Sequence, residues 1–202
     1  MTSSTCVLPL RGNGSGEFRV STLARELAAV LGLPAIHLDT LFWDPGWQMC
    51  PVDEFRARVR AALDRSGPRG WIVDGNYTSR LGNMVGDAAT DVIWLDPPLL
   101  LYFPRLCWRT LLRLLRIGDP CAPGCDESIR EVFFSSESII WWCLSNHWTV
   151  RKREGERYRT DGVHVGGNCR RIAGWGGELA AWKRDVRAMV EAGARRSAAR
   201  PS

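Results

Sequence analysis

Residues 11–24, RGNGSGEFRVSTLA, decide how this chain is expected to fold. They follow an apolar run at residues 5–10 that predicts a β-strand, and they lead into residues 21–31, whose apolar side chains recur at the period of an α-helix. A glycine-rich turn between a strand and a helix directs backbone N–H groups into one concavity, beside the partial positive charge of the helix N-terminus. Phosphate is the ligand expected at such a turn.

The turn departs in two places from the complete phosphate-binding motif, G-x-x-x-x-G-K-[ST]. Arg11 stands where the leading glycine belongs, and residues 17–20 separate Gly16 from Ser21 where the motif has a single lysine. A plain glycine-rich connection is one alternative interpretation. A faulty gene model is another, because Gly-Glu-Phe can be encoded by GGT GAG TTT, which contains the splice-donor-like string GTGAGT.

Outward from this turn, short apolar runs alternate with amphipathic stretches, which is typical of a parallel sheet flanked by helices. Further strands are predicted at residues 35–38, 71–73, 91–95 and 169–172, and helices at residues 52–63, 99–117, 126–150 and 177–192. The charged, glycine-rich residues 151–167 predict a mobile loop. A single domain of residues 1–192 is expected, with a lid region at about residues 99–167 and a disordered basic tail at residues 193–202.

The composition is that of an ordinary globular protein: 202 residues, of which 45% are hydrophobic and 24% are charged. It excludes a disordered, collagen-like or coiled-coil chain. Neither a membrane-spanning run nor a secretory signal is recognisable, so a cytoplasmic protein with no membrane partner is expected. The net charge is +5, and nearly all of the basic residues are arginine. Arginine is well suited to phosphate binding, but the genome's codon composition could equally give an arginine-rich protein. The charge alone therefore does not indicate nucleic acid as a partner.

Seven cysteines without a regular spacing predict reduced thiols. Cys121 and Cys125 form one close pair, and Cys143 and His147 form a second pair that shares one face of a predicted helix. Four such ligands could hold a zinc ion in a tetrahedron, and two packed pairs without a metal are the alternative.

Three further segments carry a family resemblance: PAIHLDTLFWDPGW at residues 34–47, WIVDGNYTSR at residues 71–80 and TDVIWLDPP at residues 90–98. With the glycine-rich turn, they make residues 12–148 resemble the P-loop kinase-like family known as DNA topology modulation proteins, relatives of adenylate kinase. The later segments resemble a eukaryotic branch of that family. The resemblance implies a three-layer α/β P-loop NTPase fold of the nucleotide-kinase type. It further implies a five-stranded, mostly parallel sheet in the order 2-3-1-4-5 and a mobile helical lid.

The resemblance also implies a site for ATP and Mg²⁺. The phosphate-binding residues are then Gly12, Gly14, Ser15, Gly16, Ser21 and Thr22, with the hydroxyl of Ser21 on the magnesium ion. Asp74 is the expected catalytic aspartate and faces the magnesium ion through water, while Asp39 and Arg80 are expected to bind the substrate. A helix cap or turn is the alternative role of Asp39.

The positions of the carboxylates agree with such a site. Asp39, Asp74 and Asp96 each follow a predicted strand, and ligands of open parallel sheets bind beyond the carboxyl ends of the strands. Carboxylate oxygens and substrate phosphates are what Mg²⁺ prefers. Asp96 is expected to be a structural or water-mediated partner rather than a direct ligand.

An arginine stripe follows the fourth predicted strand. Its members are spaced by four, four and three residues, so they share one helix face: Arg105, Arg109, Arg113 and Arg116. Because adenylate kinase relatives carry lid arginines in the corresponding region, Arg109 and Arg113 are expected to act as catalytic residues that close over phosphates. Arg151 and Arg153 are further candidates, and a solvated basic face is the alternative.

These features together favour an ATP-binding, adenylate kinase-like phosphotransferase that acts on an unidentified small-molecule acceptor. The missing lysine and the presence of Glu17 favour an alternative, a catalytically impaired nucleotide-binding pseudo-kinase or regulatory protein. A DNA-binding regulator is suggested only by the family's name, since no nucleic-acid-binding motif is present in the sequence.

Overall fold

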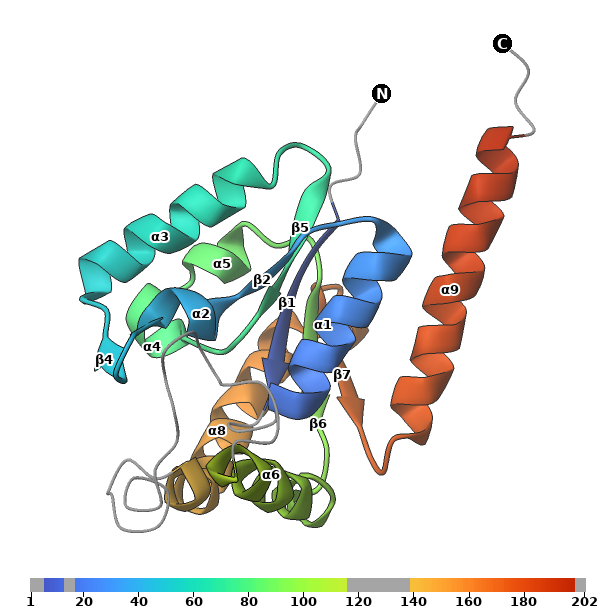
Figure 1. Cartoon of the computed structure of the whole chain (residues 1–202). Coiled ribbons are helices and arrows are strands. Elements are labelled where there is room, and N and C mark those ends of the chain that lie inside the picture. The colour runs from blue at the N-terminus through green and yellow to red at the C-terminus, as the bar shows by residue number, and fades with distance from the viewer. Residues whose placement is uncertain (1–5, 13–16, 116–138, 199–202) are drawn as a thin grey trace.

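The computed structural model describes residues 6–12, 17–115 and 139–198 (Figure 1). Five strands form one sheet in the order β2-β5-β1-β6-β7, and every neighbouring pair is parallel. The strands are β1 (Cys6–Gly12), β2 (Ala35–His37), β5 (Gly70–Asp74), β6 (Val92–Asp96) and β7 (Cys169–Ala173). Leu10 pairs with Asp74 and Gly12 pairs with Leu95, so the carboxyl end of β1 lies between those of β5 and β6.

Helices cover both faces of this sheet (Figure 1). On one face, α1 (Glu17–Leu31) and α9 (Gly177–Ala198) pack against Ile72, Ile93 and other residues of one buried cluster. On the other face, α3 (Val52–Arg65) packs against Trp71 and Val73, and α8 (Ile139–Asp161) packs against Trp94. The two sets of sheet residues alternate along each strand because successive side chains of a strand point to opposite faces.

The remaining elements connect the strands and the large helices. They are α2 (Leu38–Phe42), β3 (Trp43–Asp44), β4 (Gln48–Met49), α4 (Thr78–Leu81), α5 (Met84–Asp87), α6 (Leu99–Leu114) and the 3₁₀ helix η1 (Val163–Val165). Strands β3 and β4 form a separate antiparallel hairpin, whose turn places both Gly46 and Trp47 at positive φ. Arg58 on α3 holds this hairpin through paired bonds to Asp44, which raise the pKa of its guanidinium.

The main sheet has the predicted strand order, 2-3-1-4-5 when its own strands are numbered along the chain, but the predicted fold class, a P-loop domain with this single sheet beneath a helical lid, was wrong as stated. Helices outweigh strands in the described residues, and the β3–β4 hairpin forms a second sheet that the sequence did not predict. Residues 151–161, predicted to be a mobile loop within the lid, instead continue α8. They are held on the sheet because Arg151 pairs with Asp96 and the ring of Tyr158 lies against Trp94, so tertiary contacts stabilise a helix that local sequence does not favour.

The C-terminal boundary also differs from the prediction. Helix α9 extends to Ala198, so residues 193–198 are helical rather than part of a disordered tail. The predicted helix at residues 126–150 begins in a segment that lies outside the described residues, and its described part starts at residue 139. Among the residues that the structure describes, no helix has the length and apolarity needed to cross a bilayer.

Candidate functional site

The carboxyl ends of β2 and β5 place two of the predicted acidic residues in hydrogen-bonded pairs. Asp74 ends β5 and is 7% exposed, and its Oδ2 lies 2.9 Å from Nδ1 of His37, which ends β2. Asp39 lies in the first turn of α2, where its Oδ1 accepts a hydrogen bond of 2.5 Å from the hydroxyl of Tyr77. The predicted catalytic aspartate is therefore buried and oriented by a histidine, while Asp39 is tied to a tyrosine.

Asp96, at the carboxyl end of β6, is held by two arginines. Its Oδ2 accepts a bond of 2.9 Å from Nε of Arg171 and a second bond from Nη2 of the same side chain, and its Oδ1 lies 3.1 Å from Nε of Arg151. The Asp96 side chain is completely buried, whereas both arginines are partly exposed. Both carboxylate oxygens are thus engaged, which agrees with the expected structural role.

Helix α8 forms one wall of this edge of the sheet. Glu154, which is 2% exposed, pairs with Arg153 and accepts a hydrogen bond of 3.3 Å from the side-chain amide of Asn76. Arg157, one turn further, donates to the hydroxyl of Thr78 and to the side chain of Asn83. These bonds join α8 to the segment after β5. Arg151 and Arg153, which were further candidates for lid arginines, are each paired with a carboxylate, Arg151 with Asp96 and Arg153 with Glu154.

The predicted phosphate-binding residues are only partly placed. Gly12 is the last residue of β1, while Gly14, Ser15 and Gly16 lie outside the described residues. Helix α1 begins at Glu17, so a carboxylate-bearing residue occupies its first turn. Ser21 and Thr22 fall in the second turn, about 6 Å further along the axis at 1.5 Å per residue.

A cavity of about 430 Å³ lies beside Thr22, between α1, α6 and the turn that joins β7 to α9. Its wall includes Arg105 of α6, Lys183 of α9 and Trp175, whose side chain is 67% exposed. Lys183 also pairs with Glu26 of α1. The exposed ring of Trp175 next to Arg105 therefore gives this cavity its fit to a planar, anionic ligand. The sequence analysis missed Trp175 and Lys183, although a large aromatic residue in the glycine-rich turn GWGG at residues 174–177 was a usable signal.

The remaining predicted arginines are placed unevenly. The Arg80 guanidinium lies 4.7 Å from the centroid of the Phe42 ring, and its Nη2 donates to the sulfur of Met49 at 3.4 Å. Arg109 is half-buried on α6, whereas the side chain of Arg113 and the whole of Arg116 lie outside what the structure describes. Closure of these arginines over a phosphate therefore stays a prediction.

Two of the four predicted zinc ligands, Cys143 and His147, lie in a buried polar cluster. His147 and Cys143 share one face of α8, as predicted, and the hydroxyl of Tyr102 on α6 lies 2.6 Å from Nδ1 of His147. Burial lowers the pKa of His147, with a further contribution from Arg151, and burial together with Cys143 raises the pKa of the Tyr102 hydroxyl. Cys121 and Cys125 lie outside the described residues, so the zinc question stays open.

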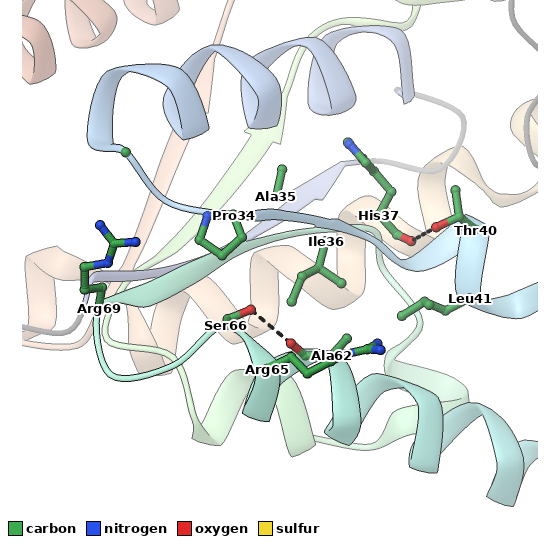
Figure 2. Close-up of a pocket in the computed structure, with 11 residues that line it drawn as sticks. Pro34, Ala35, Ile36, His37, Thr40, Leu41, Ala62, Arg65, Ser66 and Arg69 are labelled. Atoms are coloured by element: carbon green, nitrogen blue, oxygen red, sulfur yellow. Dashed lines mark hydrogen bonds between the residues drawn. The ribbon is translucent and has the colours of Figure 1, made fainter.

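A second cavity, of about 630 Å³, lies beside the edge strand β2 (Figure 2). Arg69 lies at one end and Thr40 and Leu41 at the other, with Arg65 of α3 and Ser66, directly after that helix, along the wall (Figure 2). Of the residues predicted for the nucleotide site, none lines this cavity among those described. We therefore place the candidate site at the carboxyl edge of the sheet and the adjoining Trp175 cavity.

The residues at this edge of the sheet could bind Mg²⁺ only in a site with few protein ligands. Within the described residues, Asp74 keeps Oδ1 clear of the hydrogen bond to His37, and no group of three His, Cys, Asp or Glu side chains suited to a metal is present there. Magnesium is commonly bound by one or two carboxylates together with substrate phosphates and water. Asp74, with the Ser21 hydroxyl, would hold it in that manner.

No protein-family model matches this chain, and no curated protein matches it either.

Proposed function

We propose that this chain is an ATP-binding, adenylate kinase-like phosphotransferase that acts on a small molecule. The observation that carries the proposal is the Trp175 cavity, because it lies beside Thr22 in the second turn of α1, the helix that follows the glycine-rich turn. A base stacked on Trp175 would extend its phosphates toward the glycine-rich turn, with Arg105 and Lys183 near the negative charge. The parallel arrangement of β1, β5 and β6 brings the Asp74 carboxylate to the same edge.

Each residue has a specific role in this proposal. The turn around Gly12–Gly16 would hold the phosphates, and a bound magnesium ion would supply the charge neutralisation that phosphoryl transfer needs. Asp74, oriented by His37, positions the magnesium and its water shell. Asp39 and Arg80 bind the acceptor, and Arg109 and Arg113 approach the phosphates from α6.

The start of α1 supports a second candidate, a catalytically impaired nucleotide-binding pseudo-kinase or regulatory protein. Helix α1 begins at Glu17, an acidic residue, and a phosphate is the ligand expected at this helix N-terminus. Like charges there weaken phosphate binding, and the lysine that ordinarily reaches the terminal phosphates is missing. Binding without transfer would be the result.

Both candidate functions require that the protein binds Mg-ATP, and calorimetry tests this binding. Trp175→Ala should weaken binding about fivefold or more, because stacking of one base contributes roughly 1–3 kcal/mol. Trp148→Ala is the matched control, since Trp148 is 66% exposed on α8 and does not line this cavity, so its loss should leave the affinity unchanged. Equal affinities for the wild type and the Trp175 variant would refute a base-stacking role for this cavity.

Phosphate transfer to a panel of small acceptors, followed by ADP release, separates the two candidates. Transfer that is lost in Asp74→Asn supports the enzyme, whereas binding without transfer supports the pseudo-kinase. Replacing residues 12–24 by GNGGSGKSTLA restores the complete motif and should tighten Mg-ATP binding by at least about tenfold, because the variant regains a charge-assisted bond. If the repaired and natural chains bind equally, the natural turn is not impaired and the pseudo-kinase loses its main support.

A further inference from the structure

The main sheet ends on one side at β2, and the outer edge of this strand is open. In the described residues, β2 is the first strand of the sheet and pairs with β5 alone. Ile72 of β5 donates to the carbonyl of Pro34 at 2.9 Å, which fixes the phase of the pairing. Because the backbone groups of successive residues point to opposite sides of a strand, the N–H groups of Ala35 and His37 point away from β5. An edge of this kind can accept a further extended chain.

The cavity of about 630 Å³ lies along this open edge, from Arg69 at one end to Thr40 at the other (Figure 2). Its walls come from α3 on one side of the strand and from the end of α1 on the other (Figure 2). Small residues line much of it, and they leave the space beside the strand unfilled: Gly32, Ala35, Ala62 and Ser66. The strand has three residues, or about 10 Å at about 3.3 Å per residue. The cavity therefore has the length of a short extended peptide.

The two hydroxyl groups in this cavity are oriented so that they can accept hydrogen bonds. Thr40 Oγ1 donates to the carbonyl of His37 at 2.7 Å, and Ser66 Oγ donates to the carbonyl of Ala62 at 2.9 Å (Figure 2). A hydroxyl has a single proton, so each oxygen keeps its lone pairs for an N–H group of a ligand. The cavity thus offers acceptors from hydroxyls and donors from the strand edge. A peptide backbone carries groups of both kinds, whereas an inorganic anion such as sulfate offers acceptors alone.

Arg65 and Arg69 give the cavity a positive charge. Both side chains are exposed, and no Asp or Glu is among the described residues that line the cavity. Among residues 6–12, 17–115 and 139–198, neither arginine takes part in an ion pair. Arg65 lies in the last turn of α3, where a cation is favourable for the helix dipole, but Arg69 lies beyond the helix. The pair therefore favours a ligand that brings negative charge to this end of the cavity.

We propose that this cavity binds an extended peptide, which adds to the open edge of β2 and places an acidic side chain against Arg65 and Arg69. The backbone of the peptide bonds to the outward groups of the strand, and the two arginines select the acidic side chain. The same edge of a second copy of the chain is a poorer occupant, because the described residues that line it include no acidic residue. The peptide site is separate from the proposed nucleotide site and does not depend on phosphate transfer.

Fluorescence polarisation with labelled hexapeptides tests this proposal on the full chain. The acidic probe alternates valine with glutamate, and a matched probe has lysine in place of glutamate. The acidic probe should bind at least about tenfold more tightly than the lysine probe, because only its charge is opposite to that of the two arginines. An acidic probe that is methylated at every backbone nitrogen keeps its charge but has no N–H group. It should bind at least about tenfold more weakly, since several backbone hydrogen bonds are lost.

Two sets of substitutions separate the backbone contacts from the charge. Ala35→Pro removes an N–H that points away from β5 and should weaken binding of the acidic probe about threefold or more, while Ala35→Ser keeps that N–H and is its control. The double substitution Arg65→Gln and Arg69→Gln should weaken binding at least about tenfold. Its control is Arg184→Gln with Arg187→Gln, which removes the same charge from two exposed positions of α9 outside the cavity. Unchanged thermal unfolding of each variant would show that its fold is intact.

Four results would overturn the proposal. The first is that the acidic probe shows no saturable binding up to about 1 mM. The second is that the lysine probe or the methylated probe binds as tightly as the acidic probe. The third is that the double variant of Arg65 and Arg69 binds like the wild type. The fourth is that the wild type is a dimer that Ala35→Pro dissociates, because a second copy of the chain would then occupy the edge of β2.

Discussion

The buried ion triad of Asp96, Arg151 and Arg171 gives a sharp prediction about stability. The Asp96 side chain is fully buried, while Arg151 and Arg171 are 38% and 35% exposed, so only the carboxylate depends completely on its partners. Replacing either arginine by glutamine leaves one cation and should cost about 1–2 kcal/mol, near the low end for buried pairs because the arginines can rehydrate. Replacing both leaves an uncompensated buried charge and should cost about 3–5 kcal/mol.

The decisive variant adds Asp96→Asn to the double arginine substitution. Because this third change removes the uncompensated charge, the triple variant should be more stable than the double by about 2 kcal/mol or more. Urea unfolding at constant pH measures the free energies of unfolding, with Arg195→Gln as a control for the loss of one exposed arginine, which pairs with Glu191 at 3.8 Å. A triple variant no more stable than the double would refute the view that the arginines act by neutralising Asp96.

Two further predictions concern backbone strain and pH. Gly75→Ala should destabilise the protein by roughly 1–3 kcal/mol, because φ at this position is +131° and a Cβ would lie 2.9 Å from Cβ of Leu38. Gly193→Ala on α9 meets no atom within 4 Å and serves as its control in the same thermal unfolding experiment. His147 has a pKa below the ordinary value of 6.5, so the unfolded chain binds its proton more readily and stability falls as the pH drops through that value. His147→Gln should reduce this acid loss by up to about 1.4 kcal/mol per pH unit, and an identical dependence of stability on pH in both proteins would contradict the assignment.

Some of the candidate site could be predicted from sequence because its signals are local. The apolar runs that end in Asp74 and Asp96 marked strands, and parallel strands deliver the residues at their carboxyl ends to one edge. Cys143 and His147 share a buried face because they are four residues apart on one helix. In each case, the spacing along the chain was sufficient to fix the relation in space.

Other features of the site depend on residues that are far apart in the sequence. Arg171 reaches Asp96 across 75 positions, and His37 reaches Asp74 across 37, so neither partner could be assigned from local patterns. The same limit explains why Trp175 and Lys183 were missed, since their cavity forms only where α1, α6 and α9 meet.

The sequence by itself determined where the five strands of the main sheet and the large helices lie along the chain, because the period of apolar residues reports which side of each element must leave water. Only the tertiary structure decided the state of residues 151–161, which are charged and would suit a loop. They are helical because Arg151, Glu154 and Tyr158 find partners on Asp96, Asn76 and Trp94, which lie on β6 or just after β5. Most helical stability in proteins comes from tertiary packing, so these contacts, rather than local propensity, fix the conformation of residues 151–161.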